Sequence, residues 1–181
     1  MTSWRRSVSP YSGGTVPDLH RSSLTARRLE RESSIAPVKG IAVDLDEVLA
    51  DTRPLWRDWL EDAARRARVE LDVPEDRTAA VAVLDERLGD WRPLLRRFAD
   101  DRAPLHFRPR PDTNAQLRRL SAAGVRIGVV TDAPRELTDV ALTHVGVARQ
   151  ISVVGTLEEV AQALENDFVA VVSRRVLLSL R

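Results

Sequence analysis

The sequence predicts an α/β protein in which a parallel β-sheet with crossover helices is interrupted, after its first strand, by an all-helical insertion. Three observations support this prediction. A short apolar segment at 41–45 has two carboxylates at its end, residues 53–106 show helical spacing, and apolar strands alternate with helices from residue 110 onward. Such alternation favours a parallel sheet, because parallel neighbours need a crossover connection, which is usually a helix.

Composition limits the class of protein. The chain has 181 residues, enough for one sizeable core with a small inserted module. It contains no cysteine, which excludes disulfides and thiol chemistry. No apolar run reaches the ~18 residues of a membrane span, and the first residues lack the apolar stretch of a secretory signal. We therefore expect a cytoplasmic protein that does not contact membranes.

Charge is distributed unevenly along the chain. Residues 1–39 hold seven basic and three acidic residues, whereas the remainder holds 21 basic and 24 acidic residues. Residues 1–37 also show little apolar periodicity, so burial cannot offset their ordering entropy. We predict a disordered basic arm at 1–37 that either docks an acidic partner or is a leader without function. No nucleic-acid binding is expected of the folded remainder.

The first strand is predicted at 41–45, and the insertion at 53–106 should contain three helices. The first begins near Pro54, because proline suits an initial helical position. The second spans about 77–88 and stops at the following glycine, and the third follows with Asp90 as its cap. Three tryptophans fall on the apolar faces and should form the core of the insertion: Trp56, Trp59 and Trp91.

After the insertion, strands and helices alternate to the end of the chain. Polar residues fall at the ends of two of these strands, Thr131 and Ser173, as well as at the end of the first strand. Reactive groups in parallel sheets collect at the carboxyl ends of strands. The expected elements are a helix at 112–123 begun by Asp112, a strand at 125–130, a helix at 134–145, a strand at 151–154, a helix at 157–164, a strand at 168–172 and a helix at 174–180.

Two carboxylates, Asp44 and Asp46, lie where the first strand should end. An acid at the mouth of a buried strand is costly unless it is hydrogen-bonded, bound to metal or reactive. A break in the chain after Asp44 would turn both side chains toward one reacting group. One carboxylate would then attack as a nucleophile while the other gives and takes a proton. The simpler interpretation is a strand end whose acids cap the next turn.

Residues 40–52, Gly-Ile-Ala-Val-Asp-Leu-Asp-Glu-Val-Leu-Ala-Asp-Thr, resemble the first motif of the haloacid dehalogenase superfamily, which consists mostly of phosphohydrolases. The resemblance implies a Rossmann-like core at 38–52 and 107–181, with 53–106 as a helical cap. It also implies that Asp44 forms an aspartyl-phosphate and that Asp46 is the general acid/base. Glu47 departs from the pattern, since the family most often has Gly there.

A second motif fits the same family. Val129-Val130-Thr131-Asp132 resembles an apolar strand that ends in Thr or Ser, and Thr131 would then hydrogen-bond a phosphoryl oxygen. Arg110-Pro111-Asp112 resembles the return from an inserted cap into the core. Taken alone, Thr131 also fits a plain strand terminus.

The third and fourth motifs are missing. The third is a basic residue between the third and fourth strands, but residues 151–173 contain neither Lys nor Arg. The fourth places acids after the fourth strand, where this chain reads Ser173-Arg174-Arg175. Asp132 is a candidate for the missing acid, with a role in substrate binding. Arg174 and Arg175 are candidates for the missing cation that binds substrate, because positive charge at a helix start costs ~0.3–1 kcal/mol and indicates a negative partner.

The resemblance also implies Mg²⁺. With ligands only from Asp44 and Asp46, the ion would depend on several waters and bind weakly. Two functions remain open. The first is a phosphohydrolase acting on a small phosphorylated substrate. The second is a binding or regulatory protein on the same fold, in which an arginine takes the place of Mg²⁺.

Overall fold

The structure is a computed structural model that describes residues 39–164 and 168–180. The arm predicted at 1–37 lies outside the described residues. Four parallel strands form one sheet in the order β3-β2-β1-β4. The strands are β1 (Gly40–Asp44), β2 (Arg126–Val130), β3 (Val153–Gly155) and β4 (Phe168–Val172).

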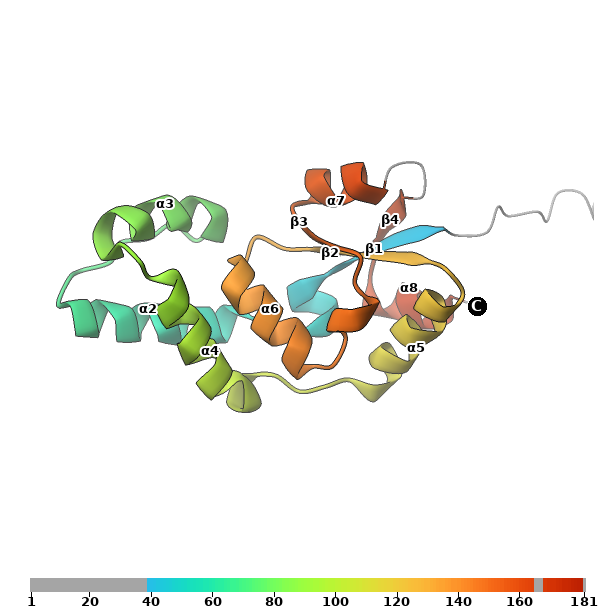
Figure 1. The fold of residues 1–181 in the computed structure, drawn as a ribbon, viewed down its shortest axis with the longest axis horizontal. Coiled ribbons are helices and arrows are strands. Elements are labelled where there is room, and N and C mark those ends of the chain that lie inside the picture. Colours follow the sequence, from blue (N-terminus) through green and yellow to red (C-terminus); the bar gives the residue numbers. More distant parts are fainter. Residues whose placement is uncertain (1–38, 165–167, 181) are drawn as a thin grey trace, which may run out of the picture. The chain divides into compact units, whose positions relative to one another are not determined.

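The α/β prediction is confirmed, and the helices alternate with strands in the expected order (Figure 1). Two short turns add to the pattern: a π-helical turn directly after β1 (Leu45–Leu49) and a 3-10 turn (Ala148–Gln150) before β3. The helices are α2 (Arg53–Ala67), α3 (Arg77–Leu88), α4 (Arg92–His106), α5 (Pro111–Ala122), α6 (Arg135–His144), α7 (Leu157–Leu164) and α8 (Arg174–Ser179).

Side chains of β1 alternate between the two faces of the sheet, as strand geometry requires. Ile41 belongs to the main apolar cluster, which also contains Leu117 of α5 and Leu177 of α8. Ala42 belongs to a second cluster with Val160 of α7. Figure 1 shows α7 on one side of the sheet and α5 and α8 on the other. The central strand is therefore buried on both faces, which fixes the position of its carboxyl end.

The helical insertion, residues 53–106, consists of α2, α3 and α4. Its three tryptophans are buried and in contact, with ring centroids 5.1 Å apart for Trp56 and Trp59 and 5.4 Å apart for Trp59 and Trp91. The expectation that they form a core is confirmed. Helix α4 packs against α6, so the apolar cluster continues from the insertion into the sheet layer.

Three local expectations were wrong. Helix α4 starts with Trp91, not Asp90, at the N-cap position, because Trp91 is fully buried there and its indole donates to Asp85 Oδ1 at 2.8 Å. The edge strand β3 begins two residues later than expected, at Val153, since the 3-10 turn precedes it. Asp112 does not cap α5: the N-cap position is held by Arg110, without a side-chain hydrogen bond.

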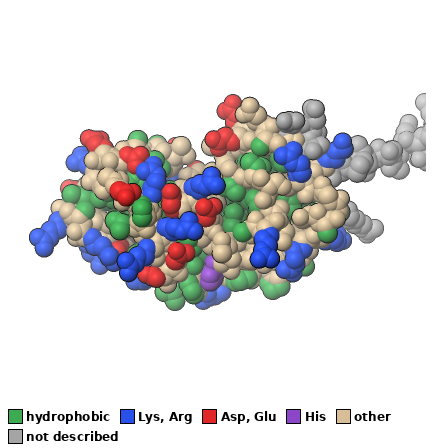
Figure 2. All heavy atoms as spheres, in the orientation of Figure 1, with side chains coloured by type: hydrophobic (Ala, Val, Ile, Leu, Met, Phe, Trp, Pro, Cys, Tyr) green, Lys and Arg blue, Asp and Glu red, His purple; other side chains and the backbone are tan. Residues whose placement is uncertain are grey.

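Charges of both signs are interspersed on the face of the molecule drawn in Figure 2, over the insertion as well as beside it. The described side chains on this face therefore form no extended patch of one sign. None of the helices within 39–164 and 168–180 is long and apolar enough to cross a bilayer.

Candidate active site

A cleft of about 750 Å³ lies where β1 and β2 end, and the helical insertion supplies its opposite wall. Asp44, Asp46 and Asp132 line it from the ends of the strands. Arg53, Arg57 and Arg77 line it from the insertion. The parallel register pairs Asp44 with Val130, so the residues that follow β1 and β2 meet at one edge of the sheet. The predicted gathering of Asp44, Asp46 and Asp132 is therefore observed, with cations that come from the insertion.

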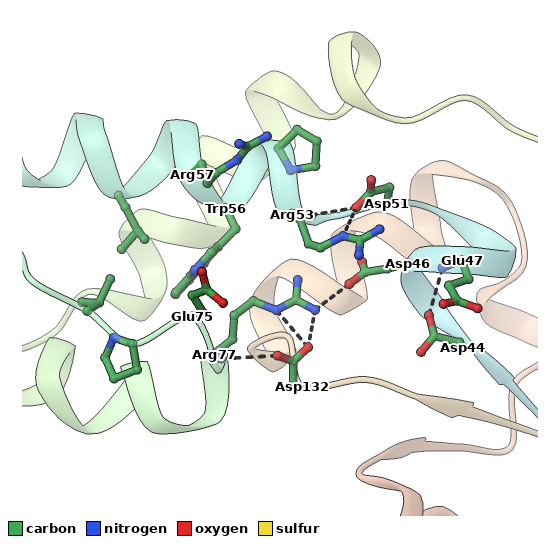
Figure 3. A pocket seen from close by; sticks show the side chains of 14 residues that line it. Asp44, Asp46, Glu47, Asp51, Arg53, Trp56, Arg57, Glu75, Arg77 and Asp132 are labelled. Atoms are coloured by element: carbon green, nitrogen blue, oxygen red, sulfur yellow. Dashed lines mark hydrogen bonds and ion pairs between the residues drawn. The ribbon is translucent and has the colours of Figure 1, made fainter.

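Asp44 is the last residue of β1 and the N-cap of the π-helical turn. Its Oδ1 accepts a hydrogen bond from Glu47 N at 2.9 Å (Figure 3). Among the described residues this is the only hydrogen bond to the Asp44 side chain, so Oδ2 has no donor, and Asp44 lines the cleft. Glu47, the residue that departs from the family pattern, thus supplies the backbone donor that orients Asp44.

The Asp46 side chain accepts more hydrogen bonds than that of Asp44. Its Oδ1 accepts from Thr52 N at 2.8 Å and from Thr52 Oγ1 at 2.6 Å. The Asp46 side chain is 11% exposed, and Thr52 is fully buried. Arg110 holds the turn that carries Asp46, because its Nη1 donates to Val48 O at 2.7 Å and Glu47 O at 3.1 Å. The Asp46 carboxylate is therefore fixed by local structure before any ligand binds.

Arg77, at the start of α3, is the feature that sequence reasoning missed. Its Nη2 donates to Asp46 Oδ2 at 2.6 Å, and its Nη1 donates to Thr52 Oγ1 at 2.7 Å. Its Nε donates to Asp132 Oδ1 at 2.9 Å, and Nη2 also pairs with Asp132 (Figure 3). We call these four residues the Arg77 cluster: Arg77, Asp46, Thr52 and Asp132.

The electrostatics of the cluster follow from this geometry. Burial favours the neutral form of Arg77, but hydrogen bonds and the charges of Asp132 and Asp46 outweigh it and raise the pKa of Arg77. Burial likewise tends to raise the pKa of Asp132, yet the bonds and charge of Arg77 hold the pKa of Asp132 below its ordinary value. Both groups are therefore charged at neutral pH.

A signal for Arg77 was present in the sequence. Arg77 is the first residue of α3, where the helix dipole disfavours positive charge. The same argument selected Arg174 and Arg175, because they directly follow a strand. Arg77 could not be selected from the sequence, because it is 31 residues from Asp46 and 55 residues from Asp132 along the chain.

The other candidates lie elsewhere. Arg174 pairs with Asp112, and its Nε donates to Thr113 Oγ1 at 3.2 Å, so its guanidinium contacts the start of α5. Arg175 is exposed and is not among the residues that line the cleft. The predicted substrate-binding roles of both arginines have no support in this geometry.

Thr131 follows β2, as expected, but it lines a second cavity beside β3. Its Oγ1 accepts from Ala133 N at 3.1 Å, and its backbone N donates to Gly155 O at 3.0 Å. This arrangement fits a strand terminus. Contact between Thr131 and a phosphoryl group stays a prediction.

The donor set does not fit Mg²⁺ in this conformation. No group of three or more acidic or histidine side chains within the described ranges is arranged to hold a metal ion. Both oxygens of Asp46 accept from donors of the Arg77 cluster, and Asp132 is occupied by Arg77. Magnesium prefers an octahedron of oxygen ligands, which these carboxylates cannot offer while Arg77 is bound to them.

In structure, the chain is similar to CbbY from Rhodobacter sphaeroides in complex with phosphate, with 14% identity, 74% of this chain and 76% of that chain covered, and a TM-score of 0.55. It also resembles β-phosphoglucomutase from Clostridium difficile, with 13% identity, 74% and 75% covered, and a TM-score of 0.48. A sequence comparison with curated proteins finds no match.

A family model provides the assignment. The model of the haloacid dehalogenase-like hydrolases matches residues 38–175, which include both strand-end motifs, the helical insertion and all four strands. The chain therefore belongs to the haloacid dehalogenase-like hydrolase family.

Proposed function

We propose that this protein is a phosphohydrolase that acts on a small phosphorylated metabolite through an aspartyl-phosphate on Asp44. The observation that supports this proposal best is the position of Asp44 Oδ2. Asp44 lines the cleft at the carboxyl end of the central strand, and its Oδ2 accepts no hydrogen bond from a described residue. A carboxylate that is held through one oxygen can use its other oxygen as a nucleophile toward phosphorus.

In the proposed reaction, Asp44 Oδ2 bonds to phosphorus while the bond from phosphorus to the leaving oxygen breaks. The leaving oxygen takes a proton from Asp46. A water then attacks the phosphoryl group and gives a proton back to Asp46, and the bond to Asp44 breaks to release phosphate. The cycle returns both carboxylates to their starting state.

In the structure, Asp46 has no free oxygen to exchange a proton with the leaving oxygen. Its Oδ1 accepts from Thr52 N and Thr52 Oγ1, and its Oδ2 accepts from Arg77 Nη2. Turnover therefore requires Arg77 to release Asp46, and a shift of the helical insertion would achieve this. Such movements of covering elements commonly limit turnover.

The experiment is hydrolysis of a generic aryl phosphate by wild type and Asp44→Asn. We expect Asp44→Asn to lose detectable turnover, and Asp46→Asn to lose roughly 10²–10⁴-fold, the usual contribution of a general acid/base. Acid-quenched wild type should carry one phosphoryl group by intact mass, and Asp44→Asn should carry none. Asp100→Asn, the same change on an exposed position of α4, is the matched control.

Hydrolysis of the aryl phosphate by Asp44→Asn at the wild-type rate would contradict the proposal. The second candidate, a binding protein without turnover, is favoured by one observation, the engagement of Asp46 by Arg77. It predicts that wild type and Asp44→Asn hydrolyse phosphate esters equally, at the background rate.

A further inference from the structure

We propose that Arg77 is a built-in cation that takes the place of a divalent metal among Asp46 and Asp132, so that the helical insertion and Mg²⁺ compete for the same carboxylates. This inference rests on the proposed function for the identity of the site. Its test measures metal binding, not turnover, so the two proposals can fail separately.

The first argument is occupancy. Arg77 directs Nε, Nη1 and Nη2 at three side chains, and its backbone N also donates to Asp132 Oδ2 at 3.3 Å. The Arg77 side chain is 5% exposed, so this is a built contact and not a surface arginine that happens to lie near acids. A metal ion bound to Asp46 Oδ2 and Asp132 Oδ1 would have to displace the guanidinium (Figure 3).

The second argument is charge. A buried guanidinium is tolerated only where carboxylates and hydrogen bonds compensate it. In return, Arg77 brings one positive charge to Asp46 and Asp132, which would otherwise attract a cation from solution. The chain has no acid at the end of β4, where it reads Ser173-Arg174-Arg175. Arg77 therefore neutralises one of the two negative charges that Asp46 and Asp132 carry, and no acid after β4 adds to them.

The third argument is the origin of the cation. Arg77 belongs to α3, whereas Asp46 and Asp132 follow strands of the sheet. Withdrawal of the insertion from the sheet would remove the cation and expose both acids together. By linkage, an ion that binds these acids must favour the withdrawn position, and the closed insertion must weaken binding of the ion.

The test is calorimetric titration of the full chain with MgCl₂, for wild type, Arg77→Gln and the matched control Arg53→Gln. Arg53 also lines the cleft, but it is exposed and pairs with Asp51. We expect no measurable Mg²⁺ binding by wild type or Arg53→Gln. Arg77→Gln should bind Mg²⁺ at least about tenfold more tightly, because a unit positive charge beside a divalent ion has been removed.

Thermal unfolding gives a second readout. Millimolar Mg²⁺ should raise the Tm of Arg77→Gln and leave that of wild type unchanged, since a ligand stabilises only the state that binds it. The proposal is overturned if wild type binds Mg²⁺ as tightly as Arg77→Gln, or if Arg77→Gln gains no binding.

The variant Arg77→Lys, which keeps the positive charge, keeps the proposal testable if Arg77→Gln does not fold. If Arg77→Gln folds only with Mg²⁺ present, the proposal is supported. If it folds in neither condition, wild type and Arg77→Lys decide the question. Both retain a cation at the cluster and should not bind Mg²⁺, and tight binding by either one contradicts the proposal.

Discussion

Removing the charge of Arg77 should destabilise the fold in a way that depends on Asp46. The perturbation is a double-mutant cycle of Arg77→Met, Asp46→Asn and the combined variant. Methionine keeps the length of the side chain and removes its charge and donors. Arg77 and Asp46 are 2.6 Å apart, and their side chains are 5% and 11% exposed. This pair therefore falls in the class of buried ion pairs.

The expected loss in the free energy of unfolding depends on which charges and hydrogen bonds remain in each variant. Breaking a buried pair from one side costs about 3–5 kcal/mol, because a charge stays uncompensated. Thr52 still donates twice to Asp46 in Arg77→Met, so we expect the low end, about 3 kcal/mol. Asp46→Asn leaves Arg77 paired with Asp132 and should cost about 2 kcal/mol. The combined variant should lose less than the sum, with a coupling of about 1–2 kcal/mol.

Urea unfolding at neutral pH measures these values by linear extrapolation, with unchanged m-values as the check on two-state behaviour. The losses are smaller than the 5–15 kcal/mol total of a typical domain, so the single variants should remain folded. The matched control is the same cycle on Arg53 and Asp51, which are 2.8 Å apart but 60% and 44% exposed. Its coupling should fall below about 1 kcal/mol. Additive losses at the Arg77–Asp46 pair, or equal couplings for the two pairs, would refute the reasoning.

Three further predictions concern other parts of the molecule. Gly128→Ala should lose about 1–3 kcal/mol in urea unfolding, because a new Cβ would lie 2.4 Å from Val160 Cγ1; the double variant with Val160→Ala should recover part of this loss, and an equal loss in both would contradict the packing argument. The pKa of Asp132 is lowered in the folded protein, so its stabilising contribution is present above its unfolded pKa of about 3.9 and is lost as pH falls through the folded pKa; the stability difference between wild type and Asp132→Asn should therefore shrink below about pH 4, and a difference that is constant from pH 7 to pH 3 would show that Arg77 does not perturb Asp132. At neutral pH the rate of aryl phosphate hydrolysis should increase in Arg77→Gln, because Asp46 Oδ2 loses the donor that holds it. An unchanged rate would mean that Arg77 does not restrain the proton transfer assigned to Asp46.

Much of the fold was predictable because it depends on local patterns. The apolar residues before Asp44 specify a strand buried on both faces, and helical spacing over 53–106 specifies the insertion. Asp44 and Asp46 could be assigned to the strand end, because a parallel sheet brings the carboxyl ends of its strands to one edge. These inferences need only residues that are close along the chain.

The cation could not be located in this way. Arg77 is 31 residues from Asp46 and 55 residues from Asp132 along the chain, and no periodicity connects them. Arg174 is close to a strand end in sequence, yet it pairs with Asp112 of α5. The sequence by itself determined the α/β sheet, the helical insertion and the two strand-end carboxylates, since local hydrophobic spacing encodes them. Only the packing of the insertion against the sheet decided which arginine reaches those carboxylates, because a charge can be buried only where tertiary contacts supply its partners.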